Sequence, residues 1–274
     1  MSGATDAGKL FAAAVREQPL DLGLACSLIA AAADPTASVT EDLAALDAFA
    51  ALARPLLRNA TSAAAQAEAL QDALGKQAGF AGFAEDYQDL RSSLLPKVLR
   101  RRRGLPILLS VVWVEVARRL SVPAYLVALP GHVIVGVGDP AGEYVLVDPF
   151  HGGRTLTVHD AAERVRAAGA TFHHSQLAPA PAVAVVLRVL GNIRLLAAER
   201  GDTATRLWAT RLSLAVPGRP AALRRELGEL LGRLGDHLGG ARELDGYADD
   251  VQAAEPSAAA TARRNAQMLR ARLN

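Results

Sequence analysis

Residues 104–151, GLPILLSVVWVEVARRLSVPAYLVALPGHVIVGVGDPAGEYVLVDPFH, form the stretch of sequence that decides the fold. Its run 106–120 is apolar on nearly every face over the first eight residues, which predicts a helix inside the core. Pro106 suits the first helical position, where the N–H that proline lacks would be unpaired. Runs rich in β-formers follow at 124–129, 133–137 and 144–147, and the segment GDPAG at 138–142 predicts a hairpin turn between the last two.

Helical patterns surround this stretch on both sides. Apolar spacing predicts a first helix around residues 10–15, then helices over 22–33, from about 40 to 52, over 61–75 and over 92–101, with a glycine-aromatic loop at 79–83. A short strand is expected at 155–158. After Pro179 and Pro181 the chain returns to helices, with breaks at Gly201, 217–220, Gly239-Gly240 and Pro256. The sequence therefore predicts an α+β fold, with a small antiparallel sheet between N- and C-terminal helical layers. We expect a division into residues 1–178 and 179–274.

Composition limits the classes of partner. The chain has 274 residues, of which 51% are hydrophobic and 21% charged, a profile typical of soluble globular proteins. Its net charge of +2, from 30 basic and 28 acidic residues, gives no argument for nucleic acid or a membrane as a partner. The single cysteine, Cys26, excludes an intrachain disulfide and a zinc site built from several cysteines, and it suits a reducing compartment. With no apolar run of signal-peptide or membrane-spanning length, we expect a cytoplasmic protein.

The hairpin brings two chemically useful side chains together. A turn centred on Asp139–Ala141 pairs His132 directly with Asp148 across the two strands, on the same face, with Cβ atoms roughly 4.5–5.5 Å apart. A carboxylate at that distance can accept from one imidazole N–H and make the other nitrogen a better base. The alternative is a core histidine with its hydrogen bonds satisfied, beside an aspartate that caps the turn before Pro149.

Three motifs in this region resemble a known family. They are the Arg-Arg-Gly-x-Pro run that ends at Pro106, the Pro-Gly-His run that ends at His132, and Asp-Pro-Phe-x-Gly-Gly at 148–153. With them, most of the chain, and residues 80–156 above all, resembles the SirB-type transglutaminase-like proteins of bacteria, which often carry tetratricopeptide-like helices. Asp86-Tyr87 and Ser92-Ser93 stand where that family shows an Asp-Tyr and an Asn-Ser pair, so Ser92 departs from its pattern. The resemblance implies a transglutaminase-like, or papain-like, core.

The resemblance also implies where a nucleophile would lie. In active transglutaminase-like and papain-like enzymes a cysteine in a Gly-x-Cys run opens the buried helix and faces the histidine and aspartate. Here that run is Gly104-Leu105-Pro106, so the nucleophile position falls on Pro106, and a thioester mechanism is excluded there. Ser110, one turn further along the same helix face and about 6 Å up its axis, is an alternative nucleophile. Cys26 lies in an apolar helical run and is typical of a buried, inert thiol. Water activated by His132 and Asp148 is a further possibility.

Several other side chains are candidates for the same site. We expect Tyr87, Ser93, Pro106, Glu115, Phe150 and His151 to bind substrate. Glu115 can instead pair with Arg119 four residues later on its helix. His132, Asp148 and His151 could converge on Zn²⁺ or Fe²⁺, but their spacing resembles no standard motif, and we expect neither a metal nor another cofactor. The run Arg100–Arg103 is interpreted as a solvated helix end rather than a phosphate-binding site.

Two classes of function follow. The first is a catalytically altered member of the family that acts as a binding or scaffold protein through the His132–Asp148 cleft. The second is an enzyme of acyl or peptide chemistry, by hydrolysis or cyclisation, with His132 as base and Asp148 as the group that orients it. The expected ligand is a small molecule or a peptide or acyl substrate. Alternatively, a protein partner binds through the C-terminal helices.

Overall fold

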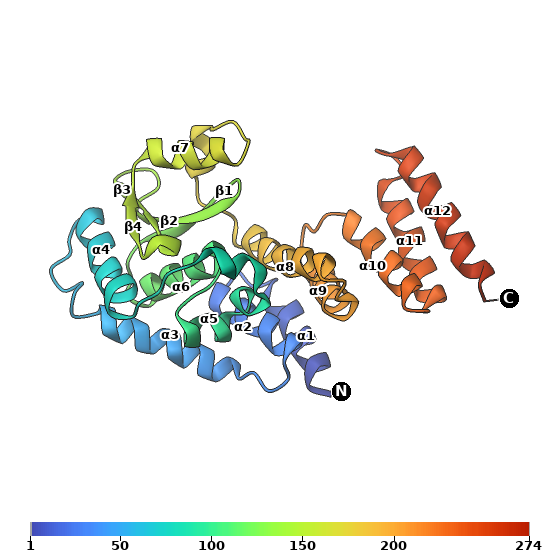
Figure 1. Ribbon diagram of the computed structural model, residues 1–274, viewed down its shortest axis with the longest axis horizontal. Coiled ribbons are helices and arrows are strands. Elements are labelled where there is room, and N and C mark those ends of the chain that lie inside the picture. The colour runs from blue at the N-terminus through green and yellow to red at the C-terminus, as the bar shows by residue number, and fades with distance from the viewer. Residues whose placement is uncertain (1, 274) are drawn as a thin grey trace.

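The computed structural model describes residues 2–273 of the chain, and the side chains of residues 6–273 (Figure 1). The helices are α1 (Ser2–Ala14), α2 (Leu22–Ala33), α3 (Val39–Ala53), α4 (Ala63–Leu70), α5 (Leu95–Arg101), α6 (Pro106–Arg119), α7 (Val158–Ala167), α8 (Ala182–Glu199), α9 (Thr203–Ala215), α10 (Ala222–Arg233), α11 (His237–Val251) and α12 (Pro256–Ala271). The strands are β1 (Ala124–Leu129), β2 (His132–Gly138), β3 (Tyr144–Asp148) and β4 (Arg154–Leu156). Short helical turns are η1 (Gln71–Gln77), η2 (Ala84–Gln88), η3 (Leu90–Ser93), η4 (Pro149–His151) and η5 (His174–Leu177).

The four strands form one antiparallel sheet in the order β1-β2-β3-β4. A two-residue turn, Pro130-Gly131, joins β1 to β2, and Leu129 pairs with His132 at its base. Gly131 has a φ of +72°, which a type II turn requires at this position and which glycine adopts without strain. This turn fixes His132 as the first residue of β2.

The hairpin register differs from the prediction. A turn centred on Pro140 would place Val137 opposite Glu143, but Val137 pairs with Val145 and Val135 with Val147. The reason is a longer loop, in which the N–H of Asp139 donates to the carbonyl of Glu143 at 2.9 Å. His132 and Asp148 are therefore not direct cross-strand neighbours. Because the register differs from the predicted one by two residues, an even number, both side chains still lie on one face of the sheet.

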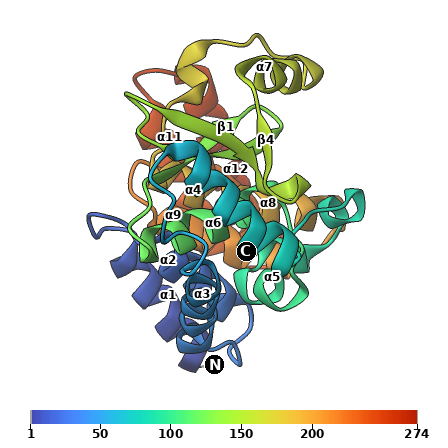
Figure 2. The same ribbon diagram turned by 90° about the vertical axis from the view of Figure 1, so that its left-hand side faces the viewer.

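The sheet is covered on both faces. Odd-numbered residues of β2, among them Val133 and Val135, pack into the principal core with α6. Even-numbered residues, such as Ile134 of β2 and Leu146 of β3, pack against α7 in a second cluster. Figure 2 shows α7, the sheet, α6 and the N-terminal helices α1 and α3 stacked in this order. The predicted central helix is confirmed, because its residues from Pro106 to Trp113 are all buried.

The helices after residue 181 fall into two groups. Side chains of α8 and α9, including Val189, Ile193 and Leu212, belong to the principal core together with the N-terminal helices. Two small clusters join α11 to α12, and with α10 these helices lie at one end of the molecule (Figure 1). The predicted division at residue 178 stays a prediction. The predicted break at Gly239-Gly240 is wrong, because both lie inside α11, where a Cβ on Gly240 would be 2.7 Å from the carbonyl oxygen of Gly228.

Three further segments differ from the prediction. The helix expected over 61–75 continues past Gly75 as the π-helical turn η1. The strand expected at 155–158 ends at Leu156, because Thr157 caps α7 by accepting from the N–H of Asp160 at 3.1 Å. That helix was not predicted. Among residues 2–273, no helix combines the length and the apolar character needed to cross a bilayer.

Candidate functional site

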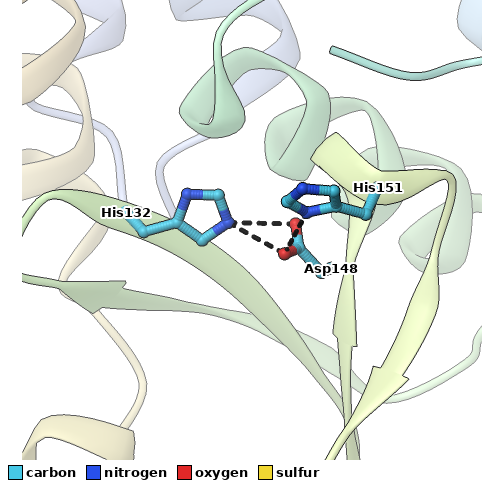
Figure 3. Close-up of side chains that lie close together, drawn as sticks. All are labelled: His132, Asp148 and His151. Carbon is cyan, nitrogen blue, oxygen red and sulfur yellow. Dashed lines mark hydrogen bonds and ion pairs between the residues drawn. The ribbon is translucent and has the colours of Figure 1, made fainter. Parts of the chain in front are cut away.

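Asp148 is the centre of the site. It is the last residue of β3, and its side chain has an exposed fraction of 0%. Nε2 of His132 lies 3.0 Å from both carboxylate oxygens, and Nδ1 of His151 lies 2.7 Å from Oδ2 (Figure 3). A guanidinium nitrogen of Arg164 is 3.1 Å from Oδ2, and the N–H of Phe150 donates to Oδ1 at 3.1 Å. Burial alone would raise the pKa of Asp148, but hydrogen bonds and charge from the two histidines lower the pKa to about 2.

The orientation of His132 follows from this carboxylate. An ionised carboxylate only accepts hydrogen bonds, so Nε2 carries the hydrogen and donates. In the neutral ring Nδ1 is then the basic nitrogen, and it points away from Asp148 (Figure 3). The ring also packs edge-on against Phe150, with centroids 5.9 Å apart and an interplanar angle of 87°. The imidazole is thus held in one tautomer by geometry.

A cavity of about 220 Å³ lies beside His132. Three of the predicted site residues line it together with His132, namely Tyr87, Ser93 and Pro106. A second cavity, of about 330 Å³, shares Tyr87 and His132 and is lined in addition by Phe150, His151 and Arg164. Six of the predicted residues, from four separate segments of the chain, therefore gather around these two cavities.

The segment that carries Tyr87 is held by a buried carboxylate. Asp86, with a side-chain exposed fraction of 0%, accepts from the hydroxyl of Ser92 at 2.6 Å and from Nε of Arg103 at 3.2 Å. Arg101 adds an ion pair at 3.4 Å. The interpretation of the arginine run as a solvated helix end is therefore wrong for these two residues, because they anchor the turn beside the cavity. Arg102 likewise donates to the carbonyl of Ala78, at 2.6 Å.

Two predicted residues lie away from the cavities. Ser110 is fully buried, and its hydroxyl donates to the carbonyl of Val133 at 3.3 Å, so the nucleophile prediction is not supported. Glu115 is buried on the far side of α6, where it pairs with Arg119 at 2.6 Å and Arg118 at 2.7 Å. Two cations pair with its carboxylate, as in the alternative that the sequence offered, and its role in substrate binding stays a prediction.

Cys26 belongs to neither cavity. It is buried in α2 with an exposed fraction of 2%. Burial, together with the negative charges of Glu115 and Asp21, raises the pKa of its thiol to about 12. A thiol with such a pKa is protonated at neutral pH and is a poor nucleophile. These properties agree with the interpretation of Cys26 as inert.

The cluster of His132, Asp148 and His151 has the residue types of a metal site. One ligand atom from each lies within 4.8 Å of the others. A divalent cation would, however, share Oδ2 of Asp148 with the guanidinium of Arg164, 3.1 Å away. That positive charge already neutralises the carboxylate, so this geometry favours hydrogen bonding over metal binding.

The sequence interpretation missed two arginines of the site. Arg164 reaches Asp148 from α7, and Arg188 reaches the cavity from α8, where its guanidinium donates to the carbonyl of His132 at 3.2 Å. Thr157 and Asp160 form a capping box, a signal that could have located α7. No local pattern places Arg188 beside His132, because they are 56 residues apart in the chain.

Comparisons with known proteins agree with this geometry. The model of the transglutaminase-like superfamily matches residues 41–191, which include every lining residue of the second cavity and all but four, on α8, of the first. A UPF0162 protein of Xylella fastidiosa is 39% identical over 184 residues, which cover 64% of each chain. One from Pseudomonas aeruginosa is 32% identical over 192 residues, 68% of each chain. F-box only protein 21 of the mouse is 28% identical over 180 residues, 63% of this chain and 28% of that protein.

The Xylella relative extends beyond the matched region, since the match spans 64% of its length. Among solved structures, menin, in a crystal structure that reveals its binding site for the Mixed Lineage Leukemia protein, aligns over 98% of this chain and 70% of its own. Its TM-score is 0.37 at 13% identity, too low to carry an argument. The match to the superfamily model covers more than half of the residues and includes the histidine, the aspartate and the buried helix. The chain belongs to the transglutaminase-like superfamily.

Proposed function

We propose that this protein binds a small-molecule, peptide or acyl ligand in the cavity beside His132, without forming a covalent intermediate. The observation that carries the proposal is the position of Pro106. It begins α6 and lines the same cavity as His132. Active enzymes that this chain resembles have a cysteine at the corresponding position. The only cysteine is buried in α2 with a pKa of about 12. A proline ring offers neither a nucleophile nor a hydrogen-bond donor.

The polar lining of the cavity supports a binding role. The hydroxyl of Ser93 is buried and has no hydrogen-bond partner among the described residues, and Tyr87 and Asn192 contribute further polar groups. Buried polar groups without partners are costly, and a ligand that supplies the missing hydrogen bonds gains affinity from them. The site is therefore suited to a ligand with several polar atoms.

Titration with a neutral probe tests this proposal. N-Acetylglycinamide, titrated into the full chain, is expected to cause saturable changes in the NMR signals of His132 and Ser93. Ser93→Met should fill part of the cavity and weaken binding at least about tenfold, which is ~1.4 kcal/mol. The matched control Ser175→Met, at an exposed position, should bind as the wild type does. Signals that stay unchanged at the cavity with both this amide and the corresponding acid, N-acetylglycine, would refute a binding role for it.

The enzyme hypothesis is retained as a second candidate, because one feature favours it. Nε2 of His132 is tied to Asp148, and a free Nδ1 can take a proton from water or from a nucleophile of the substrate. In hydrolysis, the water oxygen would bond to the substrate carbonyl and Nδ1 would accept the proton. The acyl–leaving group bond would then break, and the leaving group would depart with that proton.

Two substitutions separate the candidates. An enzyme that hydrolyses N-acetylglycine p-nitrophenyl ester should lose at least about a hundredfold in rate with His132→Ala or Asp148→Asn. The control His159→Ala, on the exposed face of α7, should keep its rate. If the wild type and His132→Ala hydrolyse the ester equally slowly, the noncovalent binding role stands alone.

Three broader expectations remain part of the proposal. They are membership of the SirB-type group, the likeness of α10–α12 to tetratricopeptide-like helices, and a protein partner on those helices. A cytoplasmic location, argued from the lone thiol, is a fourth expectation of the same kind. The names of the bacterial relatives assign no activity, and none of these expectations depends on them.

A further inference from the structure

The cavity beside His132 contains a cation without a counter-ion. Arg188 is partly buried at the wall formed by α8, and the only hydrogen bond of its guanidinium among the described residues goes to the carbonyl of His132, at 3.2 Å. No carboxylate within residues 6–273 forms an ion pair with it. Arg164, Arg103 and Arg119, which are also partly buried, each contact at least one carboxylate. Arg188 is therefore exceptional among the arginines around this core.

The surroundings of Arg188 make this charge costly. Burial lowers the pKa of its guanidinium, and the phenol of Tyr87 opposes this effect without reversing it. Glu199 also lines the cavity, but it follows Arg188 by three helical turns on α8, about 16 Å along the axis. A buried charge that no opposite charge compensates is stabilised when an anion binds beside it.

Other donors converge on the same space. Asn192 is one turn beyond Arg188 on α8 and also lines the cavity. The buried hydroxyl of Ser93, which lacks a partner, lines the cavity as well. A planar guanidinium with such neighbours matches the two oxygens of a carboxylate. A single unpaired positive charge balances the one negative charge of a carboxylate, whereas a phosphate dianion would call for more.

We infer that Arg188 binds the carboxylate of the ligand in this cavity, so that the ligand is a small carboxylic acid or the free C-terminus of a peptide. The inference rests on the proposed binding function and names the chemical class of its ligand. The carboxylate then lies beside the carbonyl of His132, and the rest of the ligand extends toward Tyr87 and the imidazole. Neutral ligands would leave the guanidinium uncompensated.

A matched pair of probes tests this inference on the full chain. N-Acetylglycine ends in a carboxylate, and N-acetylglycinamide ends in a neutral amide but is otherwise the same molecule. The acid is expected to bind at least about tenfold more tightly, measured from NMR shifts of His132 and of the Nε–H of Arg188. Arg188→Met should abolish this preference, and Arg188→Lys should keep part of it. Arg211→Met, at an exposed position on α9, should keep all of it.

The outcomes distinguish this inference from the function on which it rests. Equal affinity for the acid and the amide would overturn the role of Arg188 while leaving a binding cavity. Tighter binding of inorganic phosphate than of N-acetylglycine would overturn the choice of a carboxylate. If Arg188→Met fails to fold, the comparison of acid with amide in the wild type still decides. N-Acetyl-dialanine and its amide extend the comparison to peptide termini, and a preference for the shorter acid would point to a small molecule.

Discussion

Asp148 contributes to stability through its charge. Its pKa falls from an ordinary value of 3.8 to about 2 in the folded protein, although the group is buried. This shift corresponds to about 2 kcal/mol of stability, which is complete above pH 4 and is lost as the pH falls through 2. Asp148→Asn should therefore lower the free energy of unfolding at pH 7 by about 2 kcal/mol, because an amide cannot compensate the cations around it.

Urea unfolding of the wild type and the variant at several pH values between 7 and 2 measures this effect. The difference between the two proteins should shrink as the pH approaches 2. Asp249→Asn on the surface of α11, which loses only an exposed ion pair with Arg263, is the matched control and should lower the free energy of unfolding by at most about 1 kcal/mol. A difference that stays constant over this pH range would mean that Asp148 acts by packing rather than by charge.

Pro106 can be tested by restoring a thiol. A cysteine there would stand at the first turn of α6 and in the cavity of His132, two features that lower a thiol pKa. In Pro106→Cys we expect iodoacetamide to label one cysteine. The labelling rate should rise with pH at values below about 8.5, the ordinary pKa of a thiol. Cys26 is the internal control and should react only after unfolding, because it is buried with a raised pKa.

The dependence on His132 makes that test specific. Pro106→Cys combined with His132→Ala should react more slowly at neutral pH, since no imidazole remains to stabilise the thiolate. Intact-mass measurements over time give both rates. If both variants react alike, position 106 is not the counterpart of the nucleophile position in active relatives.

The contact between His132 and Asp148 could be predicted from the sequence, although the strand register could not. The predicted hairpin register is wrong by two residues. Because this shift is even, the side chains of His132 and Asp148 still lie on the same face of the sheet. Arg164 and Arg188 could not be predicted, because each reaches the site from a helix whose position depends on packing. Sequence periodicity specifies which face of an element is buried, but not which distant helix covers it.

Among the elements, the turn η4 depends on a close approach to the loop before η2. The N–H of Gly82 donates to the carbonyl of Phe150 at 2.8 Å, and a Cβ built on Gly82 would overlap the Phe150 ring. Gly82→Ala should therefore displace the turn that carries His151 and destabilise the protein by about 1–3 kcal/mol. Gly191→Ala in α8 is the control, because its Cβ would meet nothing within 4 Å.

Urea denaturation and the NMR signals of His132 measure the two effects together. The control should be neutral or slightly stabilising, by up to about 1 kcal/mol, since alanine favours a helix more than glycine does. Gly82→Ala with unchanged stability and unchanged His132 signals would show that the turn tolerates the added methyl group. The same contact explains why the loop at 79–83, though correctly predicted, could not be linked to the site from the sequence alone.

For the whole molecule, the principal core does not end where the sequence suggested a division. Five apolar residues of α8 lie in that core with the N-terminal helices and α6: Val185, Val186, Val189, Leu190 and Ile193. Each contributes about 2 kcal/mol when buried, so their removal would cost about 10 kcal/mol. This loss is comparable to the entire stability of a typical domain, 5–15 kcal/mol.

Two truncated chains test which boundary separates independent units. Residues 1–219 retain α8 and α9 and lose only α10–α12, none of whose buried side chains belongs to the principal core. We expect this chain to unfold cooperatively in urea and to keep the wild-type NMR signals of His132. Residues 1–178 lack the part of the core that α8 supplies, and we expect them to show neither property. Cooperative unfolding of the shorter chain, with the His132 signals intact, would instead locate the boundary at Pro179–Pro181 and make α8 an accessory to the site.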